Sequence, residues 1–133
     1  MTPSEIAAAL REMAERLLAT ANTIDPVNID VDVSGSPGAA LIARERIRQI
    51  TEEGFSASGD RSHTGNELAW GAYAYLERAS QDRLPQDDPS TPHVWPWKKG
   101  QWRPKGSRIR NLTIAAALIA AEIDRRWQNG ERP

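Results

Sequence analysis

The sequence of 133 residues contains no cysteine, and its longest apolar run is short. The absence of cysteine excludes a disulfide scaffold, thiol catalysis and cysteine-based zinc sites, and it suits a reducing cytoplasm. The apolar run, residues 112–121, is well below the roughly 20 residues that a bilayer span needs. The first residues do not show a basic stretch followed by an apolar one, so we expect no secretory signal.

Charge of either sign is not in excess, with 17 Lys and Arg against 18 Asp and Glu, so the net charge of −1 indicates no particular partner. Tryptophan is the unusual residue, because five copies accompany a single phenylalanine. A tryptophan side chain combines a large contact area with a polar edge. Five are more than so small a core needs, which favours a binding role for some of them.

The sequence predicts a mainly α fold of about four helices around a buried C-terminal helix, with one short β-strand near residues 27–33. The C-terminal helix, residues 107–128, is apolar on nearly every side at its centre, and such a helix must be surrounded by others. Helical spacing predicts three further helices at residues 5–20, 39–53 and 66–79. The expected core draws on the last three helices: Leu41, Ile47, Ile50, Leu68, Leu76, Leu112, Ile119 and Ile123.

Two parts of the chain are expected. Residues 1–33 hold the first helix, with a narrow apolar stripe that includes Ile6, Leu10 and Met13, and a strictly alternating segment that is typical of a half-buried strand. A narrow stripe suits pairing with another helix, and a lone strand cannot satisfy its own backbone. We therefore predict that residues 1–33 form a homo-oligomer and that residues 39–130 form a helical domain with the binding pocket.

A basic and aromatic segment, residues 93–110, contains no acidic side chain. Cations bind phosphates and flat rings stack on bases, so the segment has the ingredients of a nucleotide site. The start of the C-terminal helix adds free N–H groups and the positive end of the helix dipole. The candidate residues are Trp95, Trp97, Trp102, Lys105 and Arg108. In the alternative interpretation the rings cap the core and the basic side chains lie over it in solvent.

A second candidate is the group Asp60, His63 and Glu67, of which the last two lie four residues apart and can face the same way. Such a group can bind a divalent metal, polarise a water molecule or accept hydrogen bonds from ribose hydroxyls. Thr64 and Glu67 also fit a helix-capping box. We favour the capping box over a metal site, and no metal or cofactor is expected.

The third candidate is the pair Arg44 and Arg48, which lie one helical turn apart and can clamp a diphosphate. The alternative is a solvated helix face with local Glu–Arg pairs. The sequence shows no glycine-rich phosphate loop, no Ser–His–Asp triad and no dinucleotide fingerprint. We expect the three candidates to converge on one pocket, because helix amphipathicity explains none of them and all lie beside predicted helix ends.

Several short motifs follow one another over about residues 40–126 and form a pattern. They are Arg44-Glu45-Arg46-x-x-Gln49, Glu53-Gly54-Phe55, Asp60-x-x-His63-x-x-x-Glu67-Leu68-Ala69, Trp95-Pro96-Trp97, Trp102-x-Pro104-Lys105, Arg110-Asn111-Leu112 and Ala117-Leu118-Ile119-x-Ala121-Glu122-Ile123. In this pattern the chain resembles small proteins encoded by bacteriophages and prophages. The resemblance implies a location in the host cytoplasm. By analogy with phage proteins that act against host defence, it also implies a sponge that sequesters a cyclic nucleotide or an ADP-ribose derivative without cleaving it.

Two alternatives to a non-catalytic sponge stay open. A MazG-like nucleotide pyrophosphohydrolase holds magnesium with two Glu-x-x-Glu/Asp pairs, whereas Glu122 and Asp124 are two residues apart and lie on different faces. A protein- or DNA-directed inhibitor would use the same basic and aromatic segment. A duplex binder would usually show more net positive charge, so nucleic acid is not an expected partner, and neither is a membrane.

Overall fold

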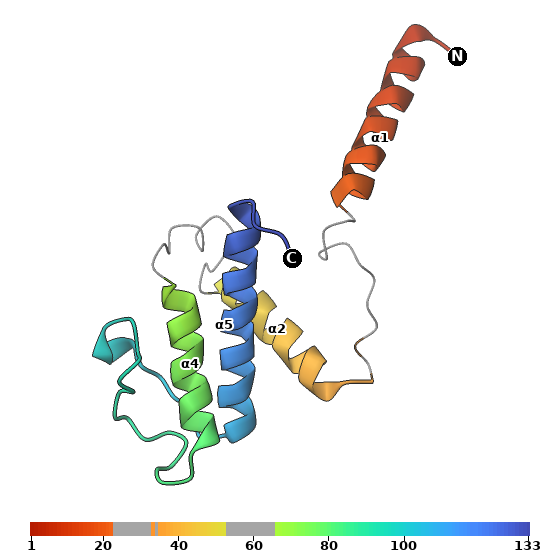
Figure 1. The fold of residues 1–133 in the computed structure, drawn as a ribbon. Coiled ribbons are helices and arrows are strands. Elements are labelled where there is room, and N and C mark those ends of the chain that lie inside the picture. Colours follow the sequence, from red (N-terminus) through yellow and green to blue (C-terminus); the bar gives the residue numbers. More distant parts are fainter. Residues whose placement is uncertain (23–32, 34, 53–65) are drawn as a thin grey trace. The chain divides into compact units, whose positions relative to one another are not determined.

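The structure, a computed structural model, describes residues 1–22, 33, 35–52 and 66–133 (Figure 1). These residues are mainly α, with four α-helices, one 3-10 helix and no strand. The elements in chain order are α1 (Pro3–Asn22), α2 (Pro37–Glu52), α4 (Glu67–Ser80), η2 (Lys99–Gln101) and α5 (Arg108–Gln128). The strand predicted near residues 27–33 lies outside the described residues, except for Val33, which is not in a strand. None of the described helices is long and apolar enough to cross a membrane.

The chain divides into two units, Met1–Val33 and Ser34–Pro133. In the first unit α1 begins with a capping box, in which Thr2 Oγ1 accepts a hydrogen bond from the Glu5 N–H and the Glu5 carboxylate accepts one from the Thr2 N–H. The stripe of Ile6, Leu10 and Met13 is 45, 61 and 57% exposed. Its pairing with another helix stays a prediction.

In the second unit α4 and α5 run antiparallel and side by side, and α2 packs on α5 (Figure 1). The guanidinium of Arg108, at the start of α5, donates a hydrogen bond to the Ala79 carbonyl at the end of α4 (2.6 Å). At the other end Arg126 of α5 donates to Asn66 Oδ1, just before α4 (2.6 Å). These two contacts fix the register of the helix pair.

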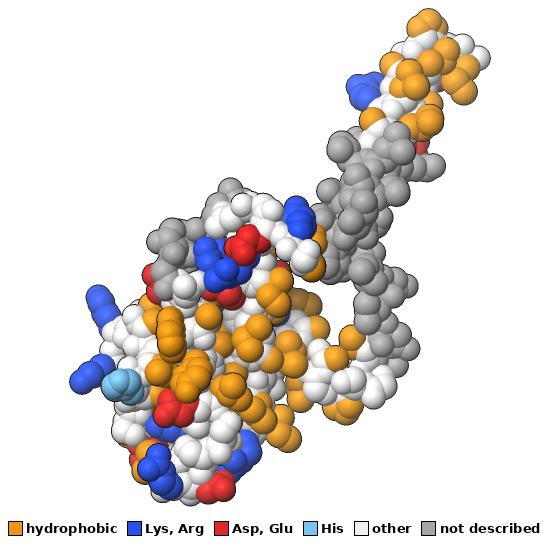
Figure 2. All heavy atoms as spheres, viewed as in Figure 1, with side chains coloured by type: hydrophobic (Ala, Val, Ile, Leu, Met, Phe, Trp, Pro, Cys, Tyr) orange, Lys and Arg blue, Asp and Glu red, His pale blue; other side chains and the backbone are white. Residues whose placement is uncertain are grey.

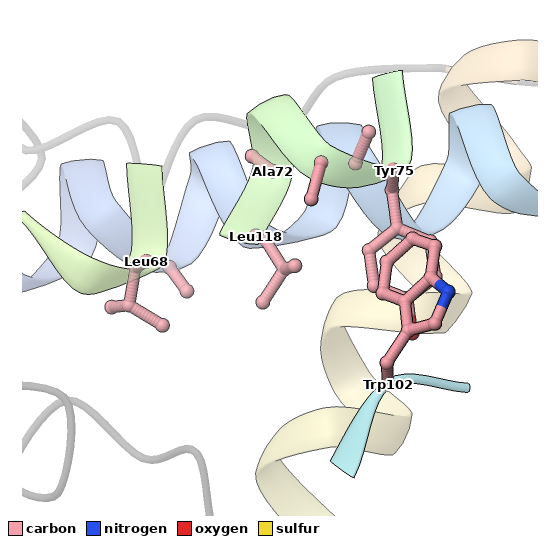
Figure 3. Packing of buried hydrophobic residues seen from close by; sticks show 8 residues of the cluster. Leu68, Ala72, Tyr75, Trp102 and Leu118 are labelled. Atoms are coloured by element: carbon pink, nitrogen blue, oxygen red, sulfur yellow. The ribbon is translucent and has the colours of Figure 1, made fainter. Parts of the chain in front are cut away.

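The hydrophobic core is small and lies between α4, α5 and residues 81–107, which connect them (Figure 3). Leu68, Ala72 and Tyr75 of α4 pack with Leu118 of α5 and with Trp102 of the connection. The indole of Trp102 is 4% exposed, and its ring centroid is 4.6 Å from that of Tyr75. A connection whose only regular element in the described structure is the short 3-10 helix η2 thus contributes the largest side chain of the core.

The prediction that α5 is surrounded is wrong. Its contact side includes Leu118 and three alanines, which let neighbouring helices approach closely: Ala115, Ala117 and Ala121. Four larger apolar residues are instead 40 to 63% exposed: Ile109, Leu112, Ile119 and Ile123. Of the eight predicted core residues, Leu68 alone is buried. The other seven are 37 to 60% exposed: Leu41, Ile47, Ile50, Leu76, Leu112, Ile119 and Ile123.

The helix α2 presents polar residues to its neighbours and apolar residues to solvent, the reverse of the predicted orientation. Arg46 and Gln49 are 8 and 2% exposed, whereas Ile47 is 60% exposed. The reason lies on α5: Arg46 donates from Nε and Nη2 to the Asp124 carboxylate at 2.9 Å. A charge-assisted pair with two donors holds α2 against α5, with the aliphatic stem of the arginine buried between them.

Residues 81–107 are attached to α5 by Asn111, whose side chain is fully buried. Its Oδ1 accepts a hydrogen bond from the Lys105 N–H (2.8 Å), and its amide donates to the Lys105 carbonyl (3.0 Å). The same amide donates to the carbonyl and to the side-chain oxygen of Gln86. One side chain therefore ties two distant points of the connection to the first turn of α5.

Arg78 of α4 fixes the middle of the same connection. Its guanidinium donates to the carbonyls of Asp88 and Ser90 and lies 5.5 Å from the centroid of the Trp102 ring. The Asp88 carboxylate accepts hydrogen bonds from the Ser90 hydroxyl and N–H. The hydrogen bond from the Ser90 hydroxyl, followed by the one from its N–H, holds the pKa of Asp88 below its ordinary value of 3.8. Desolvation opposes them with a smaller effect, and the Arg78 charge adds the smallest lowering effect.

Replacing Asn111 by alanine is expected to lower the free energy of unfolding by at least about 2 kcal/mol. The substitution removes the part-buried hydrogen bonds that Asn111 makes with Lys105 and Gln86, and each such bond contributes about 0.5–1.5 kcal/mol. Asn129→Ala is the matched control, because Asn129 is exposed at the end of α5 and its side chain forms no hydrogen bond to a described residue. Urea unfolding measures both variants, and equal stability of the two would contradict this role of Asn111.

The Asp88 carboxylate gives a second, pH-dependent expectation. A group whose pKa is lowered by folding stabilises the folded chain fully above its unfolded pKa of about 3.8, and this contribution is lost as the pH falls through the lowered folded pKa. The melting temperature should therefore fall more steeply below about pH 4 in the natural chain than in Asp88→Asn. Asp87→Asn, which removes a carboxylate without a hydrogen bond to a described residue, should keep the steep fall; identical profiles for all three chains would count against the interpretation.

Candidate functional site

A pocket of about 370 Å³ lies where α2, α4, α5 and the connection of residues 81–107 meet. We call it the aromatic pocket, because Tyr75, Trp95 and Trp97 line it. The helices α2 and α5 and the rest of the connection contribute the remaining lining residues: Glu45, Arg48, Gln49, Gln101, Arg103, Lys105, Ile114 and Leu118. Its volume falls in the range of about 300–1,000 Å³ that is usual for small-molecule sites.

The rings that line the aromatic pocket form one connected cluster. Trp95 lies edge-on to Trp97 and to Trp102, with centroids 5.0 and 4.9 Å apart, and its Nε1 donates to the Lys98 carbonyl at 3.0 Å. Trp97 lies directly on α4 at Gly71, where a β-carbon would come within 2.5 Å of the ring. Glycine at this position therefore allows the indole to lie against the helix, and the ring is held in place by its neighbours.

A second hollow, of about 400 Å³, adjoins the aromatic pocket along α2 and the start of α5. We call it the cationic pocket, because Arg44, Arg48, Lys105 and Arg110 line it. The two pockets share Arg48 and Lys105, together with two further lining residues, Glu45 and Ile114. Aromatic surface therefore passes directly into basic surface, with two cations at the junction.

The basic side chains that line the pockets differ in whether a carboxylate of the chain already pairs with them. Arg48 donates to both carboxylate oxygens of Glu45, at 2.6 and 2.9 Å, and is therefore a neutralised pair in this structure. By contrast, the charged ends of Arg44, Lys105 and Arg110 form no hydrogen bond or ion pair within the described part of the chain. These three supply most of the positive field in the cationic pocket.

One buried polar group beside the aromatic pocket is unsatisfied. Gln49 is 2% exposed, and its side-chain oxygen has no hydrogen-bond partner. Leaving a buried acceptor unpaired costs about 1–3 kcal/mol, so such groups are uncommon in folded chains. The indole N–H of Trp102 is also buried without a partner, but Trp102 lies in the core and does not line the pocket.

The structure brings together five of the ten candidate residues. Arg48, Trp95, Trp97 and Lys105 line the aromatic pocket, and Arg44 lines the adjoining cationic pocket. Three of the other five do not join them, and two are not described. Trp102 is buried in the core, Arg108 is bound to Ala79 and Asp82, Glu67 lines neither pocket, and Asp60 and His63 lie outside the described residues.

Several lining residues were not identified from the sequence. Tyr75 matched the buried side of its helix, and its hydroxyl donates to the Arg103 carbonyl at 3.1 Å, so it serves the core and the pocket together. Gln49 follows the pair of Arg44 and Arg48 in the sequence, and no sequence pattern assigned it a binding role. Arg103 and Arg110 belong to the basic segment, which contains no acidic residue. This lack of acidic neighbours was the sequence signal that could have identified them.

Gly71→Ala tests the placement of Trp97. Alanine normally stabilises a helix relative to glycine by about 0.5–1 kcal/mol. Here the new methyl group would overlap the indole, so we expect a net destabilisation of about 1–3 kcal/mol and a changed near-ultraviolet circular dichroism spectrum. Gly100→Ala is the matched control, because nothing lies within 4 Å of its β-carbon. A stabilised Gly71→Ala chain with an unchanged spectrum would show that the ring does not lie on α4.

The chain matches no protein-family model, no curated protein and no solved structure. What the two pockets bind is therefore inferred from their own residues. An aromatic cluster that passes into a group of cations is suited to a molecule with a flat ring at one end and a negative group at the other.

Proposed function

We propose that the chain binds a nucleotide-type small molecule in the two adjoining pockets and sequesters it without cleaving it, in the manner of a phage anti-defence sponge. The observation that carries this proposal is the junction of the pockets, where Arg48 and Lys105 lie between aromatic and basic surface. A base would stack on Trp97 or Trp95. The phosphates would lie beside Arg44, Lys105 and Arg110.

The size and the polarity of the site support a ligand larger than a single phosphate. Each pocket has a volume in the range of small-molecule sites, and the two adjoin at their four shared lining residues. A stacked base contributes about 1–3 kcal/mol in nucleic-acid binders, and cations contribute a separate, salt-dependent term. A cyclic nucleotide or an ADP-ribose derivative has both groups.

The state of the carboxylates favours binding over hydrolysis. Glu45 is the one carboxylate among the lining residues that the structure describes, and Arg48 engages both of its oxygens. On α5, Glu122 accepts hydrogen bonds from Arg125 and Arg126. Side chains that are already ion-paired are poor candidates for the magnesium ligands of a MazG-like enzyme.

A panel of cyclic dinucleotides, ADP-ribose derivatives and nucleoside triphosphates, followed by release on heating and mass spectrometry, tests the proposal. We expect one member to be taken up and released intact. An altered product would identify an enzyme instead. No uptake of any member would leave a protein- or DNA-directed inhibitor as the better description.

Matched variants then locate the site. Trp97→Ala and Lys105→Ala should each weaken binding of the retained ligand about tenfold or more, because each removes a contact worth about 1.4 kcal/mol or more. Trp70→Ala and Lys99→Ala remove the same side-chain types from exposed positions that line neither pocket, and should bind as the natural chain does. Equal losses in all four variants, measured by calorimetry, would exclude this site.

A further inference from the structure

The exposed side of α5 carries a row of large apolar residues. Ile109, Leu112, Ile119 and Ile123 are 63, 40, 47 and 56% exposed, and Ala116 lies between the two pairs. We call these five residues the α5 seam. They recur at alternating steps of three and four residues, which is the spacing by which one helix packs along another.

The α5 seam is part of a wider exposed apolar surface. In Figure 2 hydrophobic side chains gather along α5 and over part of α4 on the same face. The helix α4 exposes Trp70 and Tyr73 by about half, with ring centroids 5.9 Å apart. The four half-exposed aliphatic side chains of the seam amount to roughly 400 Å², within the size range of patches that mark interaction sites and half of the about 800 Å² per partner in a standard interface.

The order of residues in the α5 seam identifies the occupant. Ala116 is the small residue at the centre of the seam, and two large apolar residues follow it in each direction along α5. Two copies laid antiparallel would place Ile109 opposite Ile123, Leu112 opposite Ile119, and Ala116 opposite its own equivalent. A two-fold interface requires a surface that is complementary to itself, and a small central residue lets the helix axes approach closely.

We infer that α5 of one copy packs antiparallel on α5 of a second copy, with the two-fold axis near Ala116. The seam contains no charged residue, so this contact buries no unpaired charge. Ile109 also lines the cationic pocket, so the second copy borders that pocket at the start of α5. The inference depends on the seam and not on the identity of any ligand.

Single cysteines test the arrangement directly, because the natural chain has none. Ala116→Cys places two thiols next to each other at the two-fold axis, and mild oxidation should yield a disulfide-linked dimer. Ile109→Cys is the matched control. Its equivalent lies 14 residues further along the antiparallel partner, about 21 Å away, so it should stay unlinked. Equal cross-linking of both variants, or none of Ala116→Cys, would overturn the antiparallel arrangement.

Sedimentation of the full chain separates this interface from one formed by α1. We expect the natural chain and Leu10→Asp, which alters the exposed stripe of α1, to sediment as dimers or larger assemblies. Ile119→Asp should lose the α5 contact and therefore sediment as a smaller assembly. Its far-ultraviolet circular dichroism spectrum should remain helical, because Ile119 is half exposed. A monomeric natural chain, or a loss of association in Leu10→Asp but not in Ile119→Asp, would overturn the inference.

Discussion

The geometry of both pockets depends on the buried amide of Asn111. A connection of more than twenty residues without a long helix has little reason of its own to adopt one shape, because ordering each residue costs about 1–2 kcal/mol. Asn111 provides the reason, since it satisfies backbone groups of Lys105 and a side chain of the same connection at Gln86. With these two points fixed, and with Arg78 holding the segment between them, the intervening tryptophans have defined positions.

The aromatic residues serve the core and the pocket at once. Trp102 is a core residue, Trp95 contacts it edge-on, and Trp97 contacts Trp95 and lines the pocket. The rings therefore form a graded series from the interior to the surface. A ligand that stacks on Trp97 would contact a ring already held by its neighbours, so little side-chain entropy would be lost on binding.

The sequence predicted which segments are helical because apolar spacing and caps such as Ser107 are local signals. It did not predict which helix faces are covered. The spacing of the large apolar residues of α5 is the spacing of a buried stripe, yet the neighbouring helices pack on the side that carries Ala115, Ala117 and Ala121. Burial of Arg46 likewise depends on Asp124, 78 residues away, and no local pattern contains that partner. Residues that amphipathicity left unexplained did include Arg48, Trp97 and Lys105, whereas Trp102 and Arg108 have the same chemistry and serve the fold.

In the ion pair of Arg48 and Glu45, the Glu45 carboxylate competes with an incoming anion for the guanidinium. An anion that approaches the junction of the pockets meets a guanidinium whose charge is already balanced by a carboxylate 2.6 Å away. A singly charged group offers the arginine no more than Glu45 does, and it would also be repelled by that carboxylate. A diphosphate can compensate for both effects, because its second charge lies within reach of Lys105 or Arg44. For the proposed nucleotide ligand, the internal carboxylate thus favours a group with two negative charges over a group with one at the Arg48 side of the site.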